Sequence, residues 1–202
     1  MSLLEEAIAA HGGRERWAEL ERIRLTLRCG GIAMAMKGRH GVLSELNATV
    51  DPRRPHVEFD QLGTFDAADG RPPGMARRLR WTDDDVLHFA GYALWNYLAT
   101  PFILVEPGFS VEEIGGRRLR VTFPPEIPTH CRRQVLHLAE DGRIARVDYT
   151  AEVFGPWAMA ANRCLTHERV GGLLFATRRR VVPRGLPGPN LVTIAMSDLT
   201  LG

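Results

Sequence analysis

Hydrophobic and polar positions alternate along most of residues 118–182. The apolar positions of this pattern are Leu119, Val121, Phe123, Ala145, Val147, Tyr149, Ala151 and Val153. The positions between them are Arg118, Arg120, Arg146, Asp148, Thr150 and Glu152. A period of two is typical of antiparallel strands with one buried face and one solvated face. We therefore predict strands over residues 117–123, 133–139, 144–154, 158–169, 173–183 and 191–201.

The first part of the chain changes from helical to strand periodicity. Apolar residues at helical spacing predict a helix over residues 3–10, and Trp17 and Leu20 mark a second, short helix. From Ile23 every second residue is apolar, which predicts a strand that ends at Gly30 and Gly31. The same alternation predicts further strands over residues 32–36 and 77–81, because Ile32, Met34, Met36, Leu79 and Trp81 fall at alternate positions.

A central segment, residues 86–99, is apolar around most of a helical circumference. Thr82 and the three aspartates after it predict a helix start, since such side chains cap free amides and favour the positive helix end. Pro101 predicts the helix end. A helix that is apolar on nearly all sides is buried on nearly all sides. We therefore expect it to fill or to roof the hollow of the sheet.

These elements predict one fold class. The chain has about ten predicted strands and no β-α-β alternation, so a doubly wound fold is excluded. We predict an α+β, mostly antiparallel β protein. Its single large curved sheet, an incomplete β-barrel, is covered by the N-terminal helix and the central apolar helix. At 202 residues the chain is long enough for one substantial core, and we expect residues 1–202 to form one half-barrel domain.

Composition and charge exclude several partners. A net charge of +2 gives no electrostatic footprint for nucleic acid, and no apolar run approaches the roughly 20 residues of a membrane span. Lys37 is the only lysine. The arginine excess favours bidentate anion contacts, but it is also what a GC-rich genome produces. The sequence does not predict an oligomeric state.

The cysteines and the N-terminal residues predict a cytoplasmic protein. The chain begins without a basic segment followed by an apolar one, so we expect no secretory signal. Cys29, Cys131 and Cys164 are odd in number and widely spaced, which favours reduced thiols over a disulfide framework.

The order of elements resembles that of a known family. A helix carrying Ala10-His11-Gly12-Gly13 is followed by Trp17 and Leu20, then by a strand from Ile23, a meander, an inserted helix and a long antiparallel run. This order is similar to that of the bacterial lipoprotein-localisation (LolA/LolB-like) half-barrels. The resemblance implies an apolar cavity between sheet and helices that receives acyl chains. The chain shows neither the signal peptide nor the lipidated N-terminal cysteine of that family, so lipoprotein transport is not predicted.

The residues expected to line the hollow are mainly aromatic side chains and methionines. A cavity lined this way suits a flat or flexible apolar ligand. The predicted ligand-binding residues are Met34, Met36, Trp81, Phe89, Tyr92, Trp95, Tyr149, Arg178 and Arg180. An arginine at the cavity mouth would bind a carboxylate or a phosphate. Strand parity places Arg179 on the opposite face from Arg178 and Arg180, and a solvated sheet edge is an alternative role for the whole run.

Two residues are candidates for chemistry. His130 follows a proline in a loop between two predicted strands, where it is either a general acid or base or a loop histidine bonded to backbone. Tyr149 lies on an apolar strand face, and its hydroxyl needs a partner, either a core group or a ligand. No histidine pair has metal-ligand spacing, and no phosphate or dinucleotide fingerprint occurs, so no metal or cofactor is predicted.

Two functions are favoured by these patterns, and a purely structural or partner-binding role, which predicts a large exposed apolar patch, is a third possibility. The first is a protein that binds an apolar or amphipathic small molecule between the curved sheet and the helix over residues 86–99. The alternative is a cofactor-independent enzyme, of cyclase, isomerase or dehydratase type, that uses the same cavity. The alternative requires at least two among His130, Tyr149 and the arginines to converge on one cavity.

Overall fold

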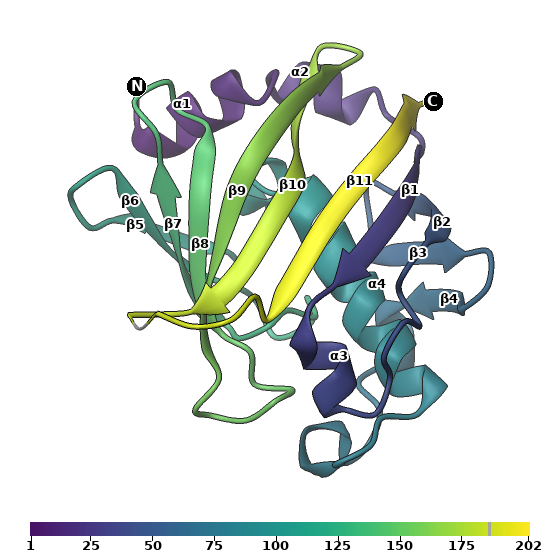
Figure 1. Cartoon of the computed structure of the whole chain (residues 1–202). Coiled ribbons are helices and arrows are strands. Elements are labelled where there is room, and N and C mark those ends of the chain that lie inside the picture. The colour runs from purple at the N-terminus through teal and green to yellow at the C-terminus, as the bar shows by residue number, and fades with distance from the viewer. Residues whose placement is uncertain (186) are drawn as a thin grey trace.

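One antiparallel sheet of 11 strands organises the chain (Figure 1). A computed structural model describes residues 1–185 and 187–202. The strands are β1 (Ile23–Gly30), β2 (Leu46–Asp51), β3 (His56–Phe59), β4 (Gly63–Asp66), β5 (Ser110–Glu113), β6 (Arg118–Thr122), β7 (Arg133–Leu138), β8 (Ile144–Thr150), β9 (Met159–Val170), β10 (Leu173–Pro183) and β11 (Val192–Leu201). Their order in the sheet is β4-β3-β2-β1-β11-β10-β9-β8-β7-β6-β5. The sheet is curved and not closed into a barrel, which confirms the predicted fold class.

The first and last strands lie side by side in the middle of this sheet. β1 pairs with β11 along its whole length, from Ile23 opposite Leu201 to Gly30 opposite Thr193. Two meanders, β1 to β4 and β5 to β11, therefore join at this one seam. The pairing is between residues far apart in sequence, so no local pattern predicts it.

The helices lie at the ends and on the concave side of the sheet. They are α1 (Leu3–Ala10), α2 (Arg14–Ala18), α3 (Ile32–Met36) and α4 (Asp83–Ala99), with 3₁₀ turns over Ala67–Asp69, Met75–Arg77 and Phe102–Val105. Figure 1 shows α1 and α2 across one end, α3 at the opposite end, and α4 running diagonally behind the strands. Ser2 and Thr82 begin α1 and α4 with capping boxes, which satisfy amides that a helix start leaves free.

Helix α4 fills most of the hollow. Every residue from Val86 to Ala99 is buried except Leu87 and Tyr97, which are half-buried. On one side Gly91 approaches Phe65 of β4 so closely that a β-carbon at Gly91 would lie 2.2 Å from the Phe65 Cγ atom. Because Gly91 has no side chain, α4 can approach β4 this closely.

We expect Gly91→Ala to destabilise the fold by about 1–3 kcal/mol, because the added methyl overpacks this contact. The gain in helix propensity, about 1 kcal/mol, offsets only part of that cost. Urea unfolding of the variant measures the change. Phe65→Ala in the same chain removes the obstacle, so the two substitutions together should cost clearly less than the sum of their separate effects. Additive costs would show that the contact is not tight.

Two predicted strands are not strands. Residues 32–36 form helix α3, because Gly31, at φ 100°, turns the chain and the amide of Ala33 bonds to the Leu191 carbonyl instead of extending a ladder. Alternating alanine and methionine are also good helix formers, so the pattern alone was ambiguous. Residues 77–81 leave a 3₁₀ turn and then run irregularly, since the Trp81 amide bonds to the Lys37 carbonyl and none of the described strands pairs with this stretch.

Candidate functional site

A cluster of aromatic hydroxyls surrounds His130 between α4 and the sheet. The Tyr92 hydroxyl lies 3.1 Å from His130 Nδ1, and the Tyr97 hydroxyl lies 3.0 Å from His130 Nε2. A neutral imidazole donates through one nitrogen and accepts through the other, so one tyrosine accepts a hydrogen bond and the other donates one. The loop that carries His130 is tied to the helix by Asn96, whose Nδ2 donates to the Pro128 carbonyl at 2.8 Å.

Burial keeps this cluster uncharged. Burial lowers the pKa of His130 to about 3 and raises the pKa of Tyr97 to about 12. It also raises the pKa values of Tyr92 and Tyr149 well above the usual range. Each charged form would lose its hydration in this interior. At neutral pH the cluster therefore offers hydrogen bonds to a ligand and holds no ready proton acceptor.

Tyr149 of β8 is the common wall of three cavities. Its ring stacks on His130, with centroids 4.2 Å apart and planes within 14°. An apolar cavity of about 160 Å³ lies on the side of Phe89 and Val192, and another of about 40 Å³ extends toward Met34. A third, of about 30 Å³, is bordered by polar groups. Tyr149 is therefore a side chain that the walls of all three spaces share.

The 160 Å³ cavity opens at the end of the sheet near α3. Three large apolar side chains in its wall are exposed to solvent: Trp157 by 66%, Met36 by 54% and Met159 by 46%. Large exposed apolar groups that gather in one place mark interaction sites rather than ordinary surface. They form the mouth, defined here as Met36, Trp157 and Met159.

Arg179 of β10 borders the polar cavity from the sheet. It is only 6% exposed, and its guanidinium carbon lies 4.6 Å from the centre of the Tyr97 ring. Nε donates to the Ala176 carbonyl at 3.3 Å, and Nη2 donates to the Tyr97 carbonyl at 3.1 Å. Among the described residues no carboxylate lies within 4.0 Å of this cation.

Comparison with known proteins supports a fold and no more. No protein-family model and no curated protein sequence matches the chain. Among solved structures, a LolA superfamily protein from Nitrosomonas europaea matches with a TM-score of 0.52 at 13% identity, over 99% of this chain and 92% of that one. The chain has a LolA-like fold. A DUF1329 family protein from Desulfovibrio piger matches with a TM-score of 0.44 at 12% identity, over 100% and 94% of the two chains.

The LolA-like hollow contains four of the residues predicted from sequence to bind a ligand. Met34, Met36, Phe89 and Tyr149 border the cavities. The other aromatic residues of that set lie elsewhere in the core. The Trp95 indole donates to the Asp51 carbonyl at 2.9 Å on the β2 side, and Trp81 packs between Phe89 and Phe154. Tyr92 contacts His130 through its hydroxyl and through its ring, and it packs against Phe89.

The arginine run is placed differently from the sequence prediction. Arg178 is exposed and Arg180 half-buried on the other face of the LolA-like sheet, while Arg179 faces the hollow. The predicted parity was correct, but the inward face is the one shared with Thr177 and Val181, both buried. The sequence did not identify that face, because Leu173, Phe175 and Val181 at odd-numbered positions are matched by Leu174, Ala176 and Val182 at even-numbered ones.

Four residues of the site were not predicted from the sequence: Tyr97, Asn96 and the mouth residues Trp157 and Met159. Tyr97 lies near the end of an apolar helix, where nothing in the pattern separates a core ring from a cavity wall. Trp157 was missed because it lies in the turn between β8 and β9, outside any periodic segment.

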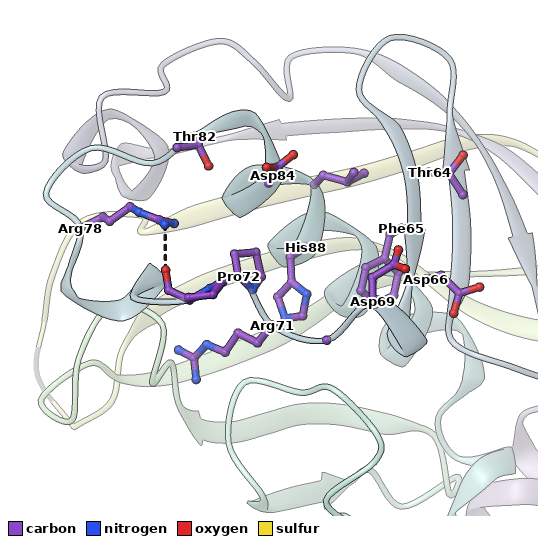
Figure 2. A pocket seen from close by; sticks show the side chains of 13 residues that line it. Thr64, Phe65, Asp66, Asp69, Arg71, Pro72, Arg78, Thr82, Asp84 and His88 are labelled. Carbon is purple, nitrogen blue, oxygen red and sulfur yellow. Dashed lines mark hydrogen bonds between the residues drawn. The ribbon is translucent and has the colours of Figure 1, made fainter.

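A hollow of about 370 Å³ on the outer side of α4 is less suited to be the site (Figure 2). Two of its charged side chains, Asp66 and Arg78, are already paired with side chains outside its wall. Asp66 bonds Arg54 and His56, and Arg78 bonds Asp85 and the Pro73 carbonyl. Arg71 and Asp84, labelled in Figure 2, also line it, and both are exposed.

The described residues also bear on metals and membranes. Within residues 1–185 and 187–202, no group of three or more histidine, cysteine, aspartate or glutamate side chains is placed to hold a metal ion. None of the helices in the same residues is long and apolar enough to cross a membrane. All three cysteines are free.

Proposed function

We propose that this protein binds an apolar or amphipathic small molecule between α4 and the concave face of the sheet. The observation that carries the proposal is the 160 Å³ apolar cavity beside Tyr149 with its exposed mouth. A cavity of roughly 150 Å³ lined by apolar side chains holds a benzene-sized group, so this one accepts a ring or a short alkyl chain. The two smaller spaces around Tyr149 provide room for a longer ligand after modest side-chain rotation.

The chemistry of the cluster favours binding over the alternative of an enzyme. His130 and Tyr149 do border one cavity, as an enzyme would require. General acid–base catalysis, however, works best with a group that titrates near the operating pH. The pKa of His130 is about 3 and the pKa of Tyr97 is about 12, far from neutrality on both sides.

Calorimetric titration with 1-octanol tests the proposal. We expect saturable binding of one molecule per chain with a negative heat-capacity change, the mark of buried apolar surface. The diol 1,8-octanediol should bind far more weakly, because its second hydroxyl has no partner at the apolar end. Mass spectrometry of a solvent extract of the purified protein would identify any ligand that co-purifies.

A cavity-filling variant supplies the control for that titration. Ala160 is buried on β9 and borders the 160 Å³ cavity, so Ala160→Leu should reduce octanol affinity by about tenfold or more while the fold is retained. Thr166→Leu places the same side chain on an exposed position of β9 and should change nothing. Equal binding by both variants would show that octanol binds outside the cavity.

A further inference from the structure

Within the described part of the chain, Arg179 is a buried cation without a counter-charge. Burying an ionised group is costly unless it is paired, and the described residues provide Arg179 with two backbone carbonyls and an aromatic ring but no carboxylate within 4.0 Å. The two carbonyl contacts occupy Nε and Nη2, so the guanidinium has further N–H donors. Two N–H groups of Arg179 therefore have hydrogen-bond acceptors, but its positive charge has no counter-charge among the described residues.

The polar cavity that Arg179 borders is lined with hydrogen-bonding groups. Tyr97, His130 and Tyr149 share its wall with Arg179. Asn96 also borders it, and the Asn96 Oδ1 atom is buried with no hydrogen-bond partner among the described residues. Buried polar atoms in native proteins nearly always have partners, so this cavity is completed by groups from outside the chain. The Asn96 oxygen is an acceptor and requires a donor such as a water molecule, whereas the unpaired Arg179 cation requires an anion.

The size of this cavity limits what completes it. Its volume of about 30 Å³ accommodates roughly two water-sized groups, at about 10–15 Å³ each. The two oxygens of a carboxylate match that space. Arginine pairs with carboxylates through two parallel hydrogen bonds, and protonated tyrosine hydroxyls donate to carboxylate oxygens.

We propose that the ligand is amphipathic and carries a carboxylate, which Arg179 binds in the polar cavity while the apolar part occupies the cavity behind the mouth. The inference rests on the proposed function, since it names the ligand class of the same site. The two cavities share the walls His130 and Tyr149, so one molecule reaches both when the Tyr149 ring turns. Bound carboxylate would neutralise Arg179 and supply hydrogen-bond acceptors to the hydroxyls around it.

Calorimetric comparison of octanoate with 1-octanol tests this ligand class. The two probes share chain length and differ in the head group. We expect wild-type protein to bind octanoate at least about tenfold more tightly than 1-octanol at neutral pH. Equal affinity would overturn the role of Arg179 and leave the proposed function standing. Failure of both probes to bind would overturn the proposed function itself, and the ligand class with it.

Substitutions on strand β10 separate a head-group role from a structural one. Arg179→Met keeps much of the side-chain length and removes the charge, so it should lower octanoate affinity far more than 1-octanol affinity and abolish the preference for octanoate. Arg178→Met, one residue away on the exposed face, should leave both affinities unchanged. If Arg179→Met alters only stability and the preference persists, Arg179 is a structural residue and the inference fails. If Arg179→Met does not fold, the ratio of the two wild-type affinities still supports or overturns the inference.

Discussion

Tyr149→Ala is expected to lower the free energy of unfolding by about 3–5 kcal/mol, the usual cost of removing a large buried aromatic side chain. The ring is 4% exposed and stacks on His130, so its loss removes packing that no neighbour replaces. The substitution also joins the cavities of about 160, 40 and 30 Å³ into one. Urea unfolding at neutral pH measures the first effect.

The same variant should change which ligand length binds best. Wild-type protein should bind 1-octanol in preference to 1-dodecanol after correction for their hydrophobicity, and Tyr149→Ala should reverse that order. Tyr149→Phe is the matched control, because it keeps the ring and removes only the hydroxyl. We expect it to cost about 1 kcal/mol and to preserve the length preference. An unchanged preference in Tyr149→Ala would show that the ring does not divide the binding space.

Acidification is expected to destabilise the protein steeply below pH 6.5. Burial lowers the pKa of His130 to about 3 and the pKa values of His11 and His88 to about 4, while each unfolded histidine titrates near 6.5. Between these values the unfolded chain binds protons that the folded chain does not, so stability falls as pH falls. Each histidine contributes a slope of about 1.4 kcal/mol per pH unit, and the three together about 4 kcal/mol.

A loss of stability of about 4 kcal/mol per pH unit is large compared with the total stability of a typical domain. Between pH 6.5 and pH 3 the three histidines together remove about 12 kcal/mol, which exceeds most stabilities in the usual range of about 5–15 kcal/mol, so we expect acid unfolding above pH 3. Urea midpoints measured from pH 7 to pH 4.5 test the slope. His130→Asn should reduce it by about a third, whereas His40→Asn, at an exposed position, should leave it unchanged. A stability that stays flat over this range would contradict the neutral, buried state of these side chains.

Local sequence patterns predicted the helices and strands whose own hydrophobic periodicity is clear. Alternation over residues 118–182 predicted the C-terminal strands, and the apolar circumference of residues 86–99 predicted helix α4. The same patterns failed at residues 32–36, where alternate alanine and methionine suit a helix as well as a strand. These patterns could not predict the pairing of β1 with β11, because it joins residues from opposite ends of the chain.

The candidate site was only partly predictable for a related reason. His130 and Tyr149 were found because a loop histidine and a tyrosine on an apolar strand are unusual. Their arrangement with Tyr97 and Arg179 depends on a helix, a loop and two strands meeting in space, which sequence spacing does not encode. The choice between Arg178 and Arg179 required knowing which face of β10 turns inward.

A crystal structure with 8-bromooctanoate tests ligand binding between α4 and the sheet most directly, because the bromine reveals its position by anomalous scattering. We expect one strong bromine peak in the 160 Å³ cavity, among Met36, Phe89 and Val192, with the carboxylate within hydrogen-bond distance of Arg179. A peak in the polar hollow beside His88, or no peak in crystals grown with saturating ligand, would contradict binding between α4 and the sheet.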